Sequence, residues 1–111
     1  MDLREIQEMQ KQFMLDRKWD RFDPSLVFVH LIEELGEVGS HLLYQAKYKV
    51  KGAGHEGDKS DLNMECAQVF NLFLQLCTIS GIDLEGAWKD EYQRNLKRFD
   101  PEVWKKLAEE S

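Results

Sequence analysis

The amino-acid sequence predicts an all-α protein, a bundle of four to five helices, and three observations lead to this prediction. Apolar residues recur at intervals of three and four along most of the chain, which is the period of a helix. No segment sustains the alternation of a strand, and no Asn-Gly or Asp-Gly pair marks a hairpin turn. Aspartate-proline pairs and glycines stand where helices begin and end. The 111 residues are expected to form one helical domain, residues 1–111.

The first expected helix carries Leu3, Ile6, Met9 and Phe13 on one face and ends near Arg17. The segment "WDRFDPS" interrupts this pattern, and its aspartate-proline pair opens a second helix that is expected to reach about residue 49. The glycine-rich segment "KGAGHEGDKSD" lacks the Gly-Lys-Ser/Thr ending of a phosphate-binding loop. It is therefore interpreted as a flexible connection.

Three more helices are expected, and each begins at a residue that can cap it. The third starts at Ser60 or Asp61 and runs to about residue 80, where Gly81 stops it. The fourth starts at Asp83 and runs to about residue 99. The fifth is short and begins at the second aspartate-proline pair, residues 100 and 101.

The composition indicates an acidic protein with a small core. The formal net charge of −6 argues against non-specific nucleic-acid binding and suits the recruitment of a cation. No run of about 18 apolar residues exists, and the charged N-terminal segment lacks the apolar centre of a signal peptide, so a cytoplasmic protein without membrane contact is expected. Cys66 and Cys77 are expected to be buried free thiols. With 42% apolar residues the core is small, which favours a homo-oligomer.

Three glutamates within one and a half turns, Glu33, Glu34 and Glu37, lie along one margin of the apolar stripe of the second helix. The residues expected to form the core on that helix are Val27, Phe28, Leu31, Leu35, Val38 and Leu42. Glutamates one turn apart repel each other, by about 0.2–0.5 kcal/mol per pair even on an exposed helix. Their clustering beside a core therefore needs an explanation.

A fourth glutamate, Glu65, lies inside the apolar stripe of the third helix. Its expected core neighbours on that helix are Leu62, Cys66, Val69, Leu72, Phe73 and Leu76. A buried carboxylate is costly unless it is paired or bound to a metal. If the two helices are antiparallel, Glu34, Glu37 and Glu65 meet, and their oxygen atoms favour Mg²⁺ or Mn²⁺ over zinc. The alternative is that these glutamates form ion pairs with lysine or arginine.

The segments "EELGEV" and "ECAQV" on successive helices resemble the MazG-like, all-α nucleoside triphosphate pyrophosphohydrolases. The family signature is Glu-Glu-x-x-Glu, a spacer and Glu-x-x-Asp. Here Glu33, Glu34 and Glu37 form the first part, residues 38–64 the spacer, and Glu65 begins the second part. The segments "KWDRF" and "EYQRNLKRF" resemble the entry and the exit of the family's core, so the likeness covers about residues 19–99.

The resemblance implies a reaction as well as a fold. Members pack four helices per protomer, form dimers or tetramers, and hydrolyse nucleoside triphosphates to a monophosphate and pyrophosphate with Mg²⁺, which is a house-cleaning role in the nucleotide pool. Glu34, Glu37 and Glu65 then match metal ligands, and Glu33 matches a ligand or the base that activates water. Asn95 and Arg98 match positions that often contact the substrate.

One position departs from the signature, because Gln68 stands where the second motif has aspartate. Glutamine offers a neutral carbonyl oxygen, so it is at most a weak metal ligand. Asp61, one turn before Glu65, or His41, one turn after Glu37, can supply the missing donor, although a helix cap is the simpler interpretation of Asp61. The alternative function is a catalytically weakened relative, a nucleotide-binding or helical interaction module.

Two further residues are candidates for substrate contact. Trp19, in the break before the glutamate-bearing helix, can stack on a nucleobase. Lys51, among the lysines around the glycine-rich segment, can meet phosphate. Core packing for the tryptophan and solubility or the helix dipole for the lysine are the simpler alternatives.

Overall fold

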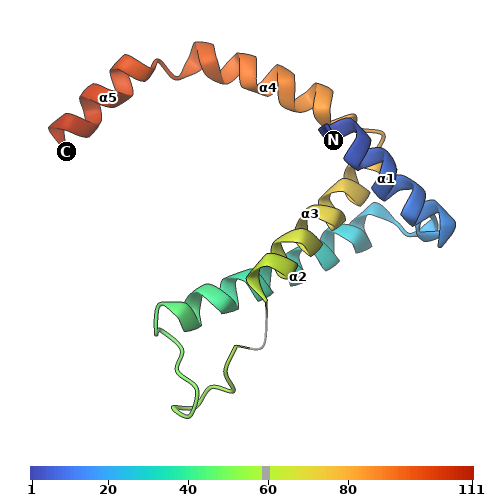
Figure 1. Cartoon of the computed structure of the whole chain (residues 1–111), viewed down its shortest axis with the longest axis horizontal. Coiled ribbons are helices and arrows are strands. Elements are labelled where there is room, and N and C mark those ends of the chain that lie inside the picture. Colours follow the sequence, from blue (N-terminus) through green and yellow to red (C-terminus); the bar gives the residue numbers. More distant parts are fainter. Residues whose placement is uncertain (59–60) are drawn as a thin grey trace.

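The computed structural model describes residues 1–58 and 61–111, and this part of the chain is an all-α helical bundle, as predicted (Figure 1). Its elements are α1 (Leu3–Asp16), the short 3-10 helix η1 (Trp19–Arg21), α2 (Pro24–Gln45), α3 (Leu62–Ile79), α4 (Leu84–Arg98) and α5 (Pro101–Glu110). The described residues contain no strand, and the loop after α2 holds only an isolated bridge between Lys51 and His55.

The predicted helix starts and stops are confirmed where the sequence offers a capping residue. The side chains of Asp23, Asp61 and Asp100 each accept a hydrogen bond from the amide two residues further on, at 2.8–2.9 Å. Gly81 adopts φ +73° and ends α3, which a residue without a Cβ does at little cost. Ser60, the other predicted start of α3, lies outside the described residues.

The predicted end of α2 is wrong, because the helix stops at Gln45 rather than near residue 49. Lys47 adopts the left-handed conformation with φ +60°. The amide of Tyr48 then donates to the carbonyl of Leu43 at 3.0 Å, which is the Schellman closure that glycine usually makes. The sequence carries a lysine there, so it gives no signal for the stop.

The helices α2 and α3 run side by side in opposite directions, and α1 crosses the end of α3 (Figure 1). The buried apolar core lies between these three helices and consists of Met14, Val27, Leu31, Leu74 and Cys77. The side chain of Gln7 on α1 holds the turn after α3. Its Nε2 donates to the carbonyl oxygen of Ile82 at 2.8 Å, and its Oε1 accepts from the backbone amide of Leu84 at 3.1 Å. These two hydrogen bonds fix the position at which α4 leaves the core.

The helices α4 and α5 form an arm, residues 84–110, that leads away from the other helices (Figure 1). The chain has a radius of gyration of 18.6 Å, whereas a compact chain of this length has about 13 Å. It exposes 8629 Å², whereas a compact monomer of its mass exposes about 6,400 Å². The arm leaves at an angle of 101° to α3, so it does not fold back over the α2–α3 pair.

Several residues predicted to be buried are exposed for this reason. Phe28, Leu35 and Leu42 of α2 are 45–51% exposed, and Phe73 of α3 is 40% exposed. Cys66, predicted to be a core thiol, is also exposed, whereas Cys77 is buried as predicted. The helical period correctly marks these residues as one apolar face, but within this chain nothing in the described residues covers it.

The hydropathy of the described helices was also compared with that of membrane spans. None of them alone combines the length and apolar character needed to cross a membrane. Only α3 and α4 taken together are long and apolar enough, and they meet at the 101° bend.

Candidate functional site

The antiparallel pairing of α2 and α3 brings the predicted glutamates together. Glu65 of α3 is only 8% exposed and faces α2. Burial raises the pKa of its carboxyl group, a hydrogen bond and the charge of Glu34 raise that pKa further, and the charges of Glu37 and Asp58 add to the effect. Three carboxyl groups therefore act on Glu65, and we call the four residues, Glu34, Glu37, Asp58 and Glu65, the acid cluster.

Gln68, the residue that departs from the signature, lies within this cluster. With its amide oriented so that the nitrogen faces the carboxylates, that nitrogen donates to Glu34 Oε2 at 3.1 Å and to Glu65 Oε2 at 3.2 Å. The glutamine thus bridges the two helices as a neutral donor. An aspartate at this position would add a negative charge instead of a hydrogen bond.

The alternative of lysine or arginine ion pairs finds no support in the described residues. None of the ion pairs found there joins Glu34, Glu37 or Glu65 to a lysine or arginine. Glu34 has a histidine neighbour, since its Oε1 lies 3.5 Å from His30 Nε2. The atoms of His30, Glu33 and Glu34 lie within 4.8 Å of one another, which is the spacing of metal ligands. Glu33 is exposed and close enough to take part.

The sequence interpretation missed Asp58, which the loop after α2 brings to the acid cluster. Its Oδ2 lies 2.5 Å from Nδ1 of His41 on α2, and both side chains are largely buried. The preceding residue is held as well, because the amide of Gly57 donates to the hydroxyl of Tyr44 at 3.0 Å. His41, considered above as a metal donor, is therefore engaged with Asp58.

Other predicted site residues have contacts outside the acid cluster. Asp61 caps α3, which is the simpler interpretation given above, and its Oδ1 is engaged with backbone amides. The aliphatic part of Lys51 lies against Gly57 in the loop. Asn95 and Arg98 are on α4, in the arm, and no contact in the described residues connects them with the glutamates.

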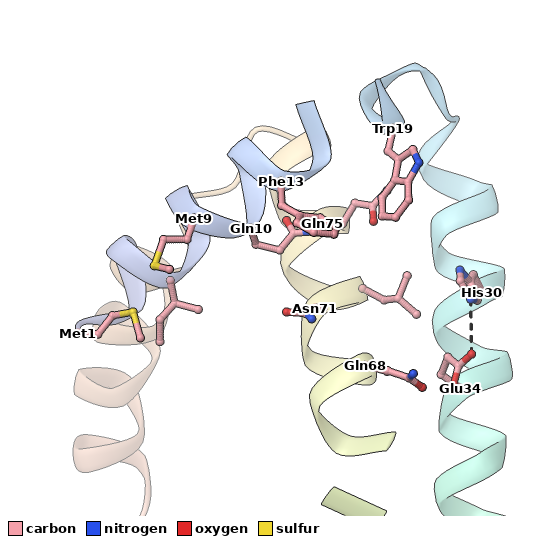
Figure 2. Close-up of a pocket in the computed structure, with 12 residues that line it drawn as sticks. Met1, Met9, Gln10, Phe13, Trp19, His30, Glu34, Gln68, Asn71 and Gln75 are labelled. Atoms are coloured by element: carbon pink, nitrogen blue, oxygen red, sulfur yellow. Dashed lines mark ion pairs between the residues drawn. The ribbon is translucent and has the colours of Figure 1, made fainter. Parts of the chain in front are cut away.

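A pocket of about 470 Å³ opens beside Glu34, between α1, α2 and α3 (Figure 2). Its lining residues are Met1, Ile6, Met9, Gln10, Phe13, Trp19, His30, Glu34, Gln68, Asn71, Leu72 and Gln75. Trp19, predicted to be a stacking residue, meets Phe13 edge to face with ring centroids 5.7 Å apart. The pocket therefore has an aromatic wall near α1 and carboxylate and amide groups toward α2.

The sequence interpretation missed the carboxamides of this pocket, Gln10 on α1 and Asn71 and Gln75 on α3. Gln75 is only 6% exposed. A signal for the α3 residues is present in the sequence, because Glu65, Gln68, Asn71 and Gln75 follow at intervals of three and four and so form a polar line along one apolar helix. The same reasoning that singled out Glu65 applies to all of them.

Comparisons of the chain with protein-family models, with curated proteins and with solved structures give no match.

Proposed function

We propose that this protein is a metal-dependent hydrolase of phosphoanhydrides, and more specifically a MazG-like nucleoside triphosphate pyrophosphohydrolase. The observation that carries the proposal is the buried carboxyl group of Glu65, which faces Glu34 and Glu37 without a lysine or arginine partner in the described residues. A buried acid among other acids is stable when a cation joins it. The intact Glu-Glu-x-x-Glu segment agrees with this class.

The donor set fits a hard divalent cation, because it consists of carboxylate oxygens. Glu34, Glu37 and Glu65 would hold Mg²⁺ or Mn²⁺, which supplies charge neutralisation for the triphosphate and for the leaving pyrophosphate. Asp58 adds a carboxylate to the same cluster in a chain that has Gln68 instead of the family's aspartate.

In the proposed reaction a water oxygen bonds to the α-phosphorus, and the bond from that phosphorus to the oxygen bridging the α- and β-phosphates breaks. The products are a nucleoside monophosphate and pyrophosphate. Glu33 would accept the proton that the water loses, a role supported by its exposure and its position beside His30 and Glu34. The reaction would take place in the cytoplasm, where the nucleotide pool is.

The pocket supports a nucleotide as the substrate. Its volume lies within the range of small-molecule pockets. Trp19 offers an apolar ring on which a base can stack, Phe13 supports it edge to face and carries the Arg17 guanidinium over its own ring, and Glu34 at the other side belongs to the acid cluster. A nucleotide has a flat base to match the aromatic side of the pocket and a metal-bound phosphate tail to match the side near Glu34.

We also propose that the working form is a homodimer or homotetramer. The chain exposes about 2,200 Å² more than a compact monomer of its mass, which is as large as the share that each chain buries in an obligate interface. Apolar residues of the arm follow at intervals of three and four, and the members are Trp88, Tyr92, Leu96, Phe99, Val103 and Leu107. A second copy offers the uncovered α2–α3 face to this stripe, and it would also bring Asn95 and Arg98 toward a site that they do not reach in their own chain.

Light scattering after size-exclusion chromatography tests the assembly. The Leu107→Glu variant places a charge within this stripe on α5 and is expected to shift the protein toward monomer. The Lys106→Glu variant changes a neighbouring charge and is the control. A wild-type chain that is monomeric at all concentrations contradicts the proposed assembly.

A nucleotide panel tests the reaction itself. The protein is incubated with all common NTPs and dNTPs, with Mg²⁺ or Mn²⁺ and with a chelator as control, and the products are identified by chromatography. The proposal expects a monophosphate and pyrophosphate, and no reaction with the chelator. Release of orthophosphate alone, or turnover that continues without divalent cations, would contradict it.

A second candidate, a nucleotide-binding or interaction module without turnover, is favoured by one observation. The Gln68 amide already bridges Glu34 and Glu65, so part of the cluster is stabilised without a cation. In that case the panel shows binding of nucleotides but no products.

A further inference from the structure

The loop that follows α2 returns to the last turns of that helix and is attached to them by three contacts. Oδ2 of Asp58 lies 2.5 Å from Nδ1 of His41, and the amide of Gly57 donates to the hydroxyl of Tyr44 at 3.0 Å. The ring of His55 meets that of Tyr44 edge to face, with the ring centroids 6.3 Å apart. These contacts hold the described end of the loop against α2.

The contact between Asp58 and His41 is shielded from water. The Asp58 side chain is 15% exposed, the His41 side chain is 25% exposed, and the Nδ1 atom of the histidine is buried. A carboxylate that has lost most of its water is costly unless another group compensates it. With a proton on Nδ1, the ring donates to Oδ2, and this contact fixes the direction in which the carboxylate points.

The same contact holds Asp58 beside the acid cluster. His41 follows Glu37 by four residues, so the two lie one turn apart on the same side of α2. The negative charge of Asp58 reaches α3 as well, because it helps to raise the pKa of the Glu65 carboxyl group. Glu65 is 8% exposed and has no lysine or arginine partner among the described residues. A buried acid in such surroundings is stable when a cation joins it.

We propose that Asp58 is a further cation ligand of the acid cluster, and that His41 is a positioning residue that holds the Asp58 carboxylate in place. This inference rests on the proposed function, because it takes the acid cluster to bind Mg²⁺ or Mn²⁺. Carboxylates that bind metals are themselves hydrogen-bonded, and the loss of such a supporting partner weakens metal binding by about 10–100-fold. The loop after α2 is then a part of the cation site, and not only a connection between two helices.

The affinity of the full chain for Mn²⁺, measured by electron paramagnetic resonance, tests the role of Asp58. Asp58→Asn is expected to weaken Mn²⁺ binding by about tenfold or more. The matched control is Glu56→Gln, which removes the same charge from an exposed residue of the same loop and is expected to leave the affinity unchanged. An Asp58→Asn variant with the affinity of the wild type, or a control that loses as much, overturns the inference.

Variants of His41 test whether this residue acts through Asp58. His41→Leu is expected to weaken Mn²⁺ binding by about tenfold, whereas His41→Asn offers an N–H near the place of Nδ1 and is expected to restore most of the affinity. Adding Asp58→Asn to His41→Leu should give no loss beyond that of Asp58→Asn alone. Losses that add in the double variant, or a His41→Leu variant with unchanged affinity, overturn the positioning role.

Paramagnetic broadening by Mn²⁺ separates this role from a general loss of structure. In the nitrogen-15 NMR spectrum of the wild type, small amounts of Mn²⁺ are expected to broaden the amide signals of Gly57 and Asp58 together with that of Glu65. In His41→Leu the two loop signals should broaden less, while the Glu65 signal is still broadened. Loop signals that Mn²⁺ leaves sharp in the wild type contradict the assignment of Asp58 as a ligand.

The failure of this inference and that of the proposed function are distinguishable. A chain that binds Mn²⁺ through Glu65 and releases pyrophosphate, with Asp58→Asn unchanged in affinity, retains the proposed function and loses the inference. A chain that needs Asp58 and His41 to bind Mn²⁺ but hydrolyses no triphosphate retains the inference and loses the reaction. A chain that binds no Mn²⁺ loses both.

Discussion

The acid cluster and the pocket beside Glu34 lie toward two ends of one face of α3, and they differ in the kind of polar group that each contains. At one end Glu65 is buried among carboxyl groups, and at the other Gln75 is buried beside a pocket lined by aromatic, aliphatic and carboxamide side chains. The two residues are ten positions apart, about 15 Å along the helix. In the proposed function, the charged groups at the first end would hold a cation that binds the phosphates, and the neutral groups at the second end would contact the base. We therefore expect changes at the two ends to affect different measured quantities.

The largest effect is expected from removing charge at the acid cluster. Glu37→Gln and Glu65→Gln should each lower the rate of pyrophosphate release by about a hundredfold or more for every nucleotide, because a lost metal ligand costs at least as much as a lost supporting group. Nucleoside binding in the presence of a chelator should stay unchanged. The control is Glu8→Gln, an exposed glutamate on α1. Activity that survives both substitutions would rule out this site assignment.

A smaller effect is expected at the aromatic wall of the pocket. Trp19→Ala should weaken nucleoside binding by about 1–3 kcal/mol, the usual contribution of stacking a base on an aromatic ring. The nucleosides tested should be affected alike, because stacking does not distinguish bases. Trp88→Ala on α4 is the matched control, and calorimetry or NMR titration is the measurement. An unchanged affinity would place the base elsewhere.

An effect of about tenfold is expected where the two ends meet, at Gln68. Gln68→Asp replaces a donor to Glu34 and Glu65 with an additional carboxylate, so Mg²⁺ should bind about tenfold more tightly while the metal-free protein melts at a lower temperature. Titration with Mn²⁺ followed by electron paramagnetic resonance measures the affinity. If it does not change, another donor, for which Asp58 is the candidate, already fills the place.

The smallest effect is expected in the dependence of stability on pH. The folded chain holds the proton of Glu65 more tightly than the unfolded chain, since burial and Glu34 raise the pKa of this group above its ordinary value of 4.5. Between pH 4.5 and the raised pKa, the folded state therefore keeps this proton while the unfolded state has lost it. The stability of the fold falls as pH rises over that interval and is level above it.

Thermal melting without metal, at a series of pH values, measures this slope, which Glu65→Gln and saturating Mg²⁺ should each remove. Readings belong above pH 5, because the hydrogen bond from Arg4 lowers the pKa of Asp83, whose contribution to stability is lost toward acid. Melting temperatures that rise with pH in this interval, or a slope that Glu65→Gln leaves unchanged, would argue against a proton held by Glu65.

The sequence predicted what local chemistry decides. Aspartate caps and Gly81 mark helix ends because the signal lies within a few residues, and a glutamate inside an apolar stripe marks Glu65. The end of α2 escaped prediction because Lys47 adopts a conformation that lysine seldom takes. Asp58 escaped because the path of the loop after α2, and not the spacing of the motif, brings it to the cluster.

The sequence predicts which face of a helix is apolar, but it does not predict what covers that face. The helical period marks Phe28, Leu35 and Phe73 as residues to be covered, and it does not say which molecule covers them. The pocket carboxamides were open to prediction from the polar line on α3, whereas the place of Gln10 in the pocket depends on how α1 crosses α3, which no spacing in the sequence gives.

The arm gives folding a dependence on the amount of protein made. The helices α2 and α3 are neighbours in the sequence, joined by residues 46–61, so their contacts can form within one chain in a first-order step. The apolar stripe of α4 and α5 has no cover in the described part of the same chain, and in the proposed assembly it waits for a second copy. That final step is second-order, so a cell that makes few copies would leave the arm exposed to proteases for longer than a cell that makes many.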